Sequence, residues 1–143
     1  MIDLNAPILP WKGMGGIKLN THISDYYEII KKATKKSSLL GNFLIRYELE
    51  DTVDLWFNIL NGKLFKITAL KNYTGKLFKE ICIGMPIETV LELEPSFVYD
   101  DFEEVYCSSK GIYIETDPVN HTVLWISVYI KEIDDVGFEK GEW

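Results

Sequence analysis

Segments in which apolar and polar residues alternate dominate the chain. This two-residue period is typical of β-strands, because successive side chains of a strand point to opposite faces of a sheet. The alternating segments are residues 43–49, 53–59, 64–70, 103–107, 111–115 and 122–133. Asn61-Gly62 lies between the second and third segments and predicts a hairpin, because both residues tolerate a positive φ. Residues 117–120 predict a looser turn before the last segment.

Two other segments have the period of a helix. In the first, Ser24 is a suitable N-cap, and an apolar stripe is accompanied by lysines near the negative end of the helix dipole. The stripe consists of Tyr26, Ile29, Ile30 and Ala33, and the lysines are Lys31, Lys32, Lys35 and Lys36. In the second, Pro86 suits the first helical position, and Pro95 ends the helix near Glu94.

The two helical segments and the residues before them form a weak internal repeat. Residues 17–29 align with residues 81–93 without a gap, and their apolar positions coincide. We therefore predict an α+β fold with two tandem helix-then-antiparallel-strand repeats, in which the helices pack on an antiparallel sheet. The repeats span about residues 16–72 and 80–133. Because no Gly/Ser-rich linker separates them, we expect residues 1–143 to form a single domain.

Composition indicates a packed cytoplasmic protein. The chain has 143 residues, of which 47% are hydrophobic, and a chain of this size buries roughly two-thirds of its unfolded surface. No apolar run approaches the ~18 residues of a membrane span, and the start lacks the basic region of a signal peptide. Cys82 and Cys107 are too few for a secreted disulfide framework. We predict a cytoplasmic location and no membrane partner.

Charge divides the chain into a basic and an acidic part. Residues 1–79 carry 12 basic and 7 acidic side chains, and residues 80–143 carry 3 basic and 15 acidic ones. The net charge of −7 argues against direct binding of nucleic acid. No lysine or arginine lies between Lys79 and Lys110, a stretch with eight acidic residues. Such a stretch is either a solvated face that keeps the protein soluble or a surface complementary to a cation.

Aromatic residues within the acidic stretch favour the second interpretation. They alternate with the carboxylates between Phe97 and Tyr106, and this composition is typical of protein interfaces. We predict a surface that binds a basic protein. Its candidate residues are Tyr99, Asp100, Asp101, Glu103, Glu104, Tyr106, Tyr113, Glu115 and Asp117.

Signs of catalysis, cofactors and metals are weak. His22 and His121 have no ligand-type side chain at helical spacing, so neither predicts a metal ligand or a general base. Cys82 and Cys107 lie in apolar segments and are interpreted as small buried hydrophobes. Residues 13–16, Gly-Met-Gly-Gly, lack the sequence of a phosphate-binding loop. We expect no enzyme activity, no cofactor and no metal.

A resemblance to known families bears on the fold. The segment Gly84-Met85-Pro86-Ile87-Glu88-Thr89-Val90-Leu91, with its strand-like entry and the hairpin after it, is similar to the unit of BamE-type outer-membrane assembly lipoproteins. Beta-lactamase inhibitory proteins carry this unit twice, so the resemblance implies the same tandem arrangement here. The chain lacks the signal peptide and lipidated cysteine of the lipoproteins, so we do not expect their membrane function.

A second resemblance bears on function. Three segments resemble small bacterial immunity proteins of contact-dependent growth inhibition systems, namely Pro10–Ile17, Glu103–Tyr106 and Gly111–Asp117. The resemblance implies a protein that binds and neutralises a cognate toxin domain, often a basic nuclease, and it assigns a role to no single residue. We therefore predict a stoichiometric toxin inhibitor whose acidic surface covers the cationic active site of a nuclease.

Two alternatives stay open. A small-ligand or peptide-binding module would hold its ligand in the cleft between the two repeats. A hydrolase that uses only carboxylates needs few sequence markers and is the third hypothesis.

Overall fold

Strands make up most of the regular structure. The structure, a computed structural model, describes residues 2–143. In this part of the chain the helices are η1 (Ile23–Tyr26), α1 (Tyr27–Ala33), α2 (Ile87–Leu93) and η2 (Lys131–Asp134), of which η1 and η2 are 3₁₀-helices. The strands are β1 (Gly13–Met14), β2 (Ile17–Lys18), β3 (Thr34–Leu40), β4 (Leu44–Leu49), β5 (Val53–Asn58), β6 (Leu64–Ala69), β7 (Phe97–Asp100), β8 (Val105–Ser108), β9 (Ile112–Thr116) and β10 (Val123–Tyr129).

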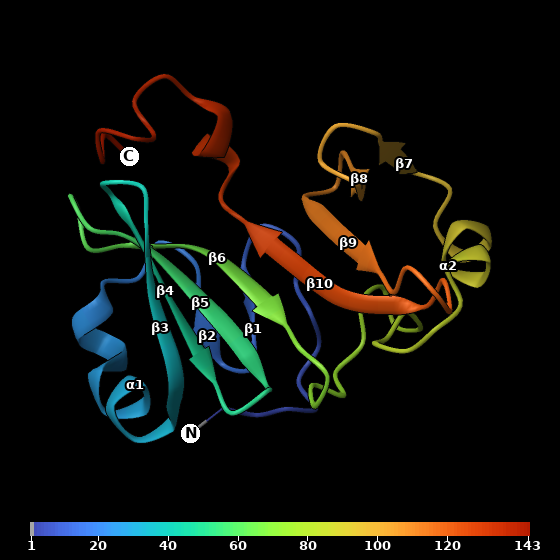
Figure 1. The fold of residues 1–143 in the computed structure, drawn as a ribbon, viewed down its shortest axis with the longest axis horizontal. Coiled ribbons are helices and arrows are strands. Elements are labelled where there is room, and N and C mark those ends of the chain that lie inside the picture. Colours follow the sequence, from blue (N-terminus) through green and yellow to red (C-terminus); the bar gives the residue numbers. More distant parts are fainter. Residues whose placement is uncertain (1) are drawn as a thin grey trace.

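Strands β3 to β10 form one continuous antiparallel sheet. Their order is β3-β4-β5-β6-β10-β9-β8-β7, so the last strand of the chain pairs with β6 in the middle of the sheet. Figure 1 shows the two groups of strands on the left and right of the molecule, meeting where β6 lies beside β10. β1 and β2 form a separate two-stranded hairpin.

One face of the sheet forms the apolar core. A row of cross-strand neighbours runs through Leu55, Ile67, Val128 and Ile112, and all four side chains are fully buried. Leucine and β-branched residues suit this position because they pack well on a pleated surface. The row crosses the pairing of β6 with β10, so the core is continuous across the two groups of strands.

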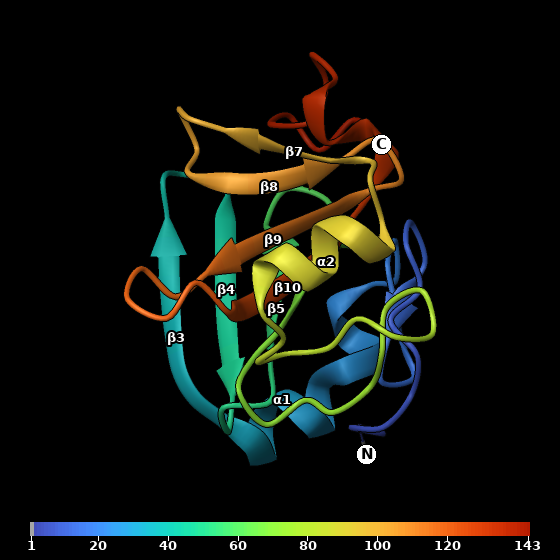
Figure 2. The ribbon, with the colours of Figure 1, turned by 90° about the vertical axis from the view of Figure 1, so that its right-hand side faces the viewer.

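The N-terminal arm and α2 cover this apolar face. Ile8, Met14 and Ile17 of the arm and of β1 and β2 are buried in the same core as the sheet. In α2, Ile87 and Val90 are buried in it as well. Figure 2 shows α2 in front of β9 and β10, and backbone hydrogen bonds to the start of β10 fix the residues just before it. With seven residues each, α1 and α2 are both too short to be stable in isolation. Their stability therefore depends on packing against the rest of the protein.

The segment after β10 continues over the end of the sheet where β5 ends and β6 begins. Phe138 packs edge-on against Phe65 and stacks on Trp143, at centroid distances of 5.0 and 5.8 Å. The fully buried Asn58 donates a hydrogen bond from Nδ2 to the Phe138 carbonyl, at 2.9 Å. This segment therefore covers the ends of β5 and β6, next to the label C in Figure 1.

The predicted fold class is wrong. The molecule is mostly β: α1 and α2 have seven residues each, and one eight-stranded antiparallel sheet takes the place of two helix-then-antiparallel-strand repeats with helices packed on a sheet. The sequence predicts a first helix that includes Lys35 and Lys36, but both lysines lie in β3. β3 pairs with β4 along its length, so hydrogen bonds to a neighbouring strand outweigh the helical propensity of lysine.

Several local predictions are confirmed. The alternating segments overlap β4, β5, β6, β8, β9 and β10. The hairpin between β5 and β6 turns at Asn61-Gly62, where Gly62 has a φ of +70° and Asn61 Oδ1 accepts a hydrogen bond from the Lys63 amide. Gly62 supplies the positive φ, and Asn61 contributes through its side chain. Within the eight-stranded sheet, the alternation pattern misses only the edge strands β3 and β7, and it also misses the short strands β1 and β2 of the separate hairpin.

Gly111 generates a test of how the N-terminal arm is docked. Its φ is +91°, and a Cβ atom would lie 2.5 Å from the Trp11 ring, which contacts the Tyr129 ring edge-on at 5.4 Å. We expect Gly111→Ala to lower the free energy of unfolding by about 2–4 kcal/mol, because it adds displacement of Trp11 to a backbone strain of ~1–2 kcal/mol. Urea unfolding measures this loss.

Gly84 provides the matched control. Its φ is +90°, but a Cβ atom there would meet nothing within 4 Å. Gly84→Ala should therefore lower the free energy of unfolding only by the backbone strain of ~1–2 kcal/mol. If Gly111→Ala and Gly84→Ala lower the free energy of unfolding by the same amount, Trp11 does not pack against Gly111 as the structure has it.

Candidate functional site

The hairpin of β7 and β8 carries the centre of the predicted acidic surface. Tyr99 and Tyr106 are cross-strand partners, and their ring centroids lie 4.9 Å apart. At the turn, Asp100 Oδ1 accepts hydrogen bonds from the amides of Phe102 and Glu103, at 2.9 and 3.1 Å. An aspartate that bonds the amides two and three residues ahead stabilises a tight turn. We call residues 100–104 the acidic tip.

The acidic tip projects its side chains into solvent. Asp101, Glu103 and Glu104 are exposed, and Phe102 is 91% exposed. The three ion pairs found within residues 2–143 join Lys35 to Asp51, Arg46 to Asp54 and Lys110 to Glu94. None of them includes a carboxylate of the tip, so its negative charge is not neutralised by contact with a cation of the described chain.

The other predicted residues do not all join this tip. Tyr106 lies opposite Ile114 of the core face, so Tyr99 and Tyr106 share that face of the sheet. Tyr113 lies opposite Cys107 and Ser127, so Tyr113 and Glu115 project from the other face. The nine predicted residues are thus divided between a loop, two faces of the sheet and a turn.

Asp117 has a structural role in the turn between β9 and β10. Its Oδ1 accepts hydrogen bonds from the amides of Asn120 and Val119, at 2.9 and 2.8 Å. These bonds hold the pKa of Asp117 below its usual range, because they stabilise the carboxylate. The loop therefore uses this carboxylate to hold its own backbone.

The histidines and cysteines show no shared site. His22 Nδ1 accepts a hydrogen bond from the Ser24 amide and so caps η1. His121 has a φ of +55° and lies in the turn before β10. Cys82 and Cys107 are free thiols. The described residues contain no group of three or more His, Cys, Asp or Glu side chains placed to hold a metal ion.

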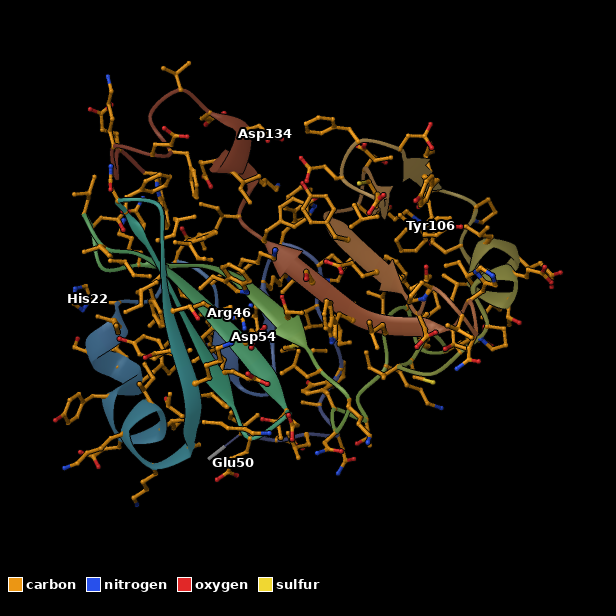
Figure 3. The ribbon with its side chains drawn as sticks, viewed as in Figure 1. His22, Arg46, Glu50, Asp54, Tyr106 and Asp134 are labelled. Carbon is orange, nitrogen blue, oxygen red and sulfur yellow. The ribbon has the colours of Figure 1, made fainter. Side chains whose placement is uncertain are left out.

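A polar cluster that the sequence analysis missed lies on the second face of the sheet, which we call the polar face. Cross-strand pairing places its residues in two neighbouring rows. The first row contains Arg46, Trp56, Lys66 and Tyr129, and the second contains Glu48, Asp54, Thr68 and Ser127. In Figure 3, Arg46 and Asp54 lie side by side near the middle of the molecule, and Tyr106 lies in the other half of the sheet.

The two rows are in contact. Arg46 Nε lies 3.8 Å from Asp54 Oδ2. Lys66 Nζ lies 4.5 Å from the centroid of the Trp56 ring, and the Arg46 guanidinium lies 5.5 Å from it, so Trp56 has two cations within cation–π range. In the second row, the hydroxyls of Thr68 and Ser127 form a hydrogen bond of 2.8 Å.

Burial shifts the pKa of both charged groups at the centre. Asp54 is only 7% exposed, and loss of hydration raises its pKa to about 6, against the opposing effect of Arg46. Burial also lowers the pKa of Lys66, although Glu115 and Asp54 oppose this shift. Within residues 2–143, Asp54 Oδ1 and Trp56 Nε1 are buried and have no hydrogen-bond partner. Each buried polar atom without a hydrogen-bond partner lowers the stability of the folded state by roughly 1–3 kcal/mol, so its presence in a native protein needs an explanation.

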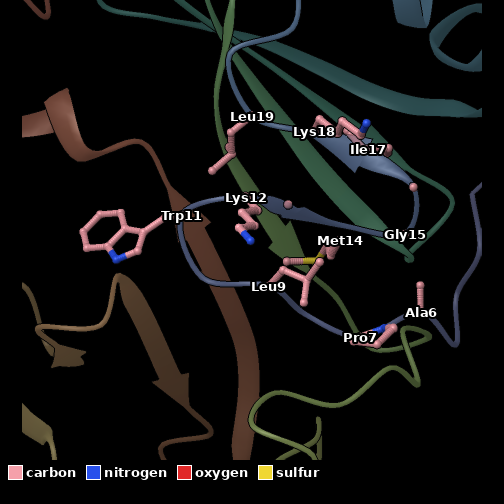
Figure 4. A pocket seen from close by; sticks show the side chains of 12 residues that line it. Ala6, Pro7, Leu9, Trp11, Lys12, Met14, Gly15, Ile17, Lys18 and Leu19 are labelled. Atoms are coloured by element: carbon pink, nitrogen blue, oxygen red, sulfur yellow. The ribbon is translucent and has the colours of Figure 1, made fainter.

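These groups line a hollow of about 360 Å³, which we call the central hollow. It lies where β6 pairs with β10, and Trp125 and Glu115 of the C-terminal strands complete its wall. A hollow of about 430 Å³ elsewhere is of another kind, because it lies within the N-terminal arm and the β1–β2 hairpin and is mostly apolar. In Figure 4 the Trp11 ring points away from the other side chains that line this second hollow, such as those of Leu9 and Met14.

Comparison with known proteins identifies a fold but no family. No protein-family model matches the chain, and the curated proteins give no match either. Among solved structures, the fold is similar to that of a cysteine-rich secretory protein from Staphylococcus aureus, with a TM-score of 0.56 and 12% sequence identity. The match covers 92% of this chain and 50% of that one, so this chain spans about half the length of its structural neighbour. At this identity the likeness concerns the fold alone.

The structure also bears on the membrane prediction. Within residues 2–143, no helix combines the length and the apolar character that a membrane crossing requires.

Asp54 generates a test by pH. Its pKa of about 6 in the folded protein exceeds the ordinary value of 3.8, so the folded state binds the proton more tightly. The contribution of Asp54 to the free energy of unfolding should therefore fall as the pH rises from about 4 to about 7, by on the order of 2–3 kcal/mol at neutral pH. We expect Asp54→Asn to remove this fall and to gain stability relative to the wild type as the pH rises, as measured by urea unfolding.

The control is Asp51→Asn. The Asp51 side chain is 48% exposed and forms a surface ion pair with Lys35, which is worth little. The free energy of unfolding of the Asp51→Asn variant should have the same pH dependence as that of the wild type. A curve for Asp54→Asn that runs parallel to the wild type between about pH 4 and about pH 7 would contradict the burial of a charged carboxyl group.

Proposed function

We propose that this protein is an immunity protein of a contact-dependent growth inhibition system, which acts in the cytoplasm. It binds a cognate toxin domain, a basic nuclease, and neutralises it through the acidic tip. The observation that supports this proposal is the composition and exposure of the tip. It presents carboxylates that no ion pair within residues 2–143 neutralises, around a phenylalanine that is 91% exposed.

The charge of the tip suits a nuclease as partner. A nuclease holds phosphate groups with lysine and arginine, and carboxylates held close together can take the place of those phosphates. The two hydrogen bonds to Asp100 hold the loop in one conformation before binding, which reduces the entropy that binding costs. Opposite charges on the two proteins also accelerate their encounter, most strongly at low salt.

The apolar residues of the hairpin supply an anchor that a merely solvated face does not need. Phe102 is 91% exposed, Val98 is 68% exposed and Tyr99 is 45% exposed. β7 is an edge strand of the sheet, so this group lies on a border that a partner can reach. Exposed aromatic residues surrounded by charge are typical of the residues that carry binding energy at protein interfaces.

Inhibition of this kind needs neither catalysis nor a cofactor. The protein acts by occupying the active site of the toxin, so it acts at equal stoichiometry. The probe is the toxin domain encoded beside the gene of this protein. We expect an equimolar complex in which the nuclease is inactive. A nuclease that stays active at excess inhibitor, or a neighbouring gene that encodes no toxin, would overturn the proposal.

Charge reversal of the acidic tip tests the role of its carboxylates. We expect the triple variant Asp101→Lys, Glu103→Lys and Glu104→Lys to slow association with the toxin domain by about tenfold or more at low salt, because it removes the attractive field. The unfolding free energy should change little, because all three side chains are exposed. Stopped-flow fluorescence measures the association rate.

A second triple variant controls for net charge. Glu80→Lys, Asp135→Lys and Glu139→Lys change the same number of exposed carboxylates away from the tip. This variant should bind faster than the variant of the tip. If the two variants associate at the same rate, only the overall charge matters and the tip is not the contact surface.

Phe102 tests the apolar anchor. We expect Phe102→Ala to weaken the complex by more than about 1 kcal/mol, or roughly fivefold, mainly through faster dissociation. Val136 is also 91% exposed, so Val136→Ala is a matched control that should leave affinity unchanged. Surface plasmon resonance with the toxin domain measures both, and equal affinities would place Phe102 outside the interface.

A further inference from the structure

The polar face contains buried groups that the proposed function does not use. Asp54 is 7% exposed and lines the central hollow, and its Oδ1 has no hydrogen-bond partner anywhere in residues 2–143. Trp56, two residues along β5 on the same face, has a buried Nε1 that lacks an acceptor within the same residues. One of these atoms requires a donor and the other requires an acceptor.

The pairing of the strands separates donors from acceptors. Arg46, Trp56 and Lys66 lie in one row, and all three side chains can only donate hydrogen bonds. Glu48 and Asp54 lie in the next row, with carboxylates that accept them. Rows two residues apart along a strand are separated by ~7 Å at the backbone. The long side chain of Arg46 bridges this distance and contacts Asp54, and Lys66 Nζ lies over the Trp56 ring of its own row.

We propose that the central hollow binds a small zwitterion, an amino acid or a dipeptide, with its carboxylate at Arg46, Trp56 Nε1 and Lys66 and its ammonium group at Asp54 Oδ1. The site lies at the junction of the two groups of strands. Its binding groups lie outside the acidic tip, although the carboxylate of Glu103 in the tip is one of the charges that act on Lys66.

Charge excludes ligands of a single sign. A plain anion would meet the carboxylates of Glu48, Asp54 and Glu115, and a plain cation would meet Arg46 and Lys66, all of which line the hollow. A zwitterion places each of its charges next to groups of opposite sign. Asp54 Oδ1 and Trp56 Nε1 are both covered in the free structure, so binding requires these side chains to turn toward the hollow. The zwitterion then supplies both missing hydrogen-bond partners at once, and a single charged group supplies only one.

The size and the walls of the hollow agree with a small ligand. Its volume of about 360 Å³ lies at the lower end of the range of ~300–1,000 Å³ that is usual for small-molecule sites. Leu70 and Trp125 line it together with the charged groups. They form an apolar wall where the side chain of an amino acid can pack.

Isothermal titration calorimetry of the isolated protein tests the proposal with four probes. L-Alanine and L-alanyl-L-alanine carry both charges, N-acetyl-L-alanine lacks the ammonium group, and L-alaninamide lacks the carboxylate. We expect at least one of the two zwitterions to bind at concentrations up to ~10 mM, and each blocked analogue of alanine to bind at least about tenfold more weakly than the bound zwitterion. No toxin is present, so this outcome is independent of the proposed immunity function.

Two conservative variants locate the binding site. Trp56→Phe keeps an aromatic ring and removes the N–H donor, and Asp54→Asn keeps the shape and removes the negative charge. Each should weaken binding of the zwitterion at least about tenfold. Lys36→Met, on the exposed edge strand β3, should leave binding unchanged. Thermal unfolding of each variant verifies that the fold is retained.

Three results would overturn the proposal. Neither zwitterion binds up to ~10 mM, in which case the hollow holds water only. The blocked analogues bind as tightly as the zwitterions, in which case charge does not determine recognition. Both folded variants, Trp56→Phe and Asp54→Asn, bind like the wild type, in which case the ligand occupies another site.

Discussion

The pairing of β6 with β10 is the interaction on which the rest of the structure depends. Four residue pairs, from Ala69 with Ile126 to Lys66 with Tyr129, join two groups of four strands into one sheet. Because side chains alternate between the two faces, this register determines which residues enter the core. A shift by one residue would turn Ile126 and Val128 toward the polar face and move Ser127 into the core. The strong cost of that exchange makes the register unique.

The same register produces two surfaces with different properties. On one face it continues the apolar row from Leu55 to Ile112 across the junction, where the N-terminal arm and α2 cover it. On the other face it places Thr68 beside Ser127 and thereby completes the central hollow. The acidic tip lies in neither layer. It extends from the far edge of the sheet, so its charge does not have to be compensated by the packing of the core.

The sequence predicts what is decided locally. Alternation predicts six of the strands, and Asn61-Gly62 predicts the hairpin between β5 and β6. Charge and aromatic residues single out the acidic tip, whose exposure depends on a short turn. The fold class is missed because β3 and β7 are edge strands that owe their conformation to their neighbours, β4 and β8. A helical pattern that extends to Lys36 does not reveal this pairing.

The polar face is missed for a related reason. Asp54 and Lys66 lie in apolar segments, where single charged residues suggest the exposed side of a strand. They become neighbours of Ser127 and Glu115 only through the junction of β6 with β10, which joins residues far apart in the sequence. The only sign of this face in the sequence is that polar residues alternate with the apolar residues of β5 and β6. They indicate a polar face without indicating which other strands complete it.

An experimental structure of this protein bound to the toxin domain tests the functional account most directly. We expect the loop between β7 and β8 to be buried in the interface, with its carboxylates against lysine or arginine side chains of the toxin and the ring of Phe102 in a pocket between them. A complex in which this loop faces bulk solvent would contradict the assignment of the binding surface.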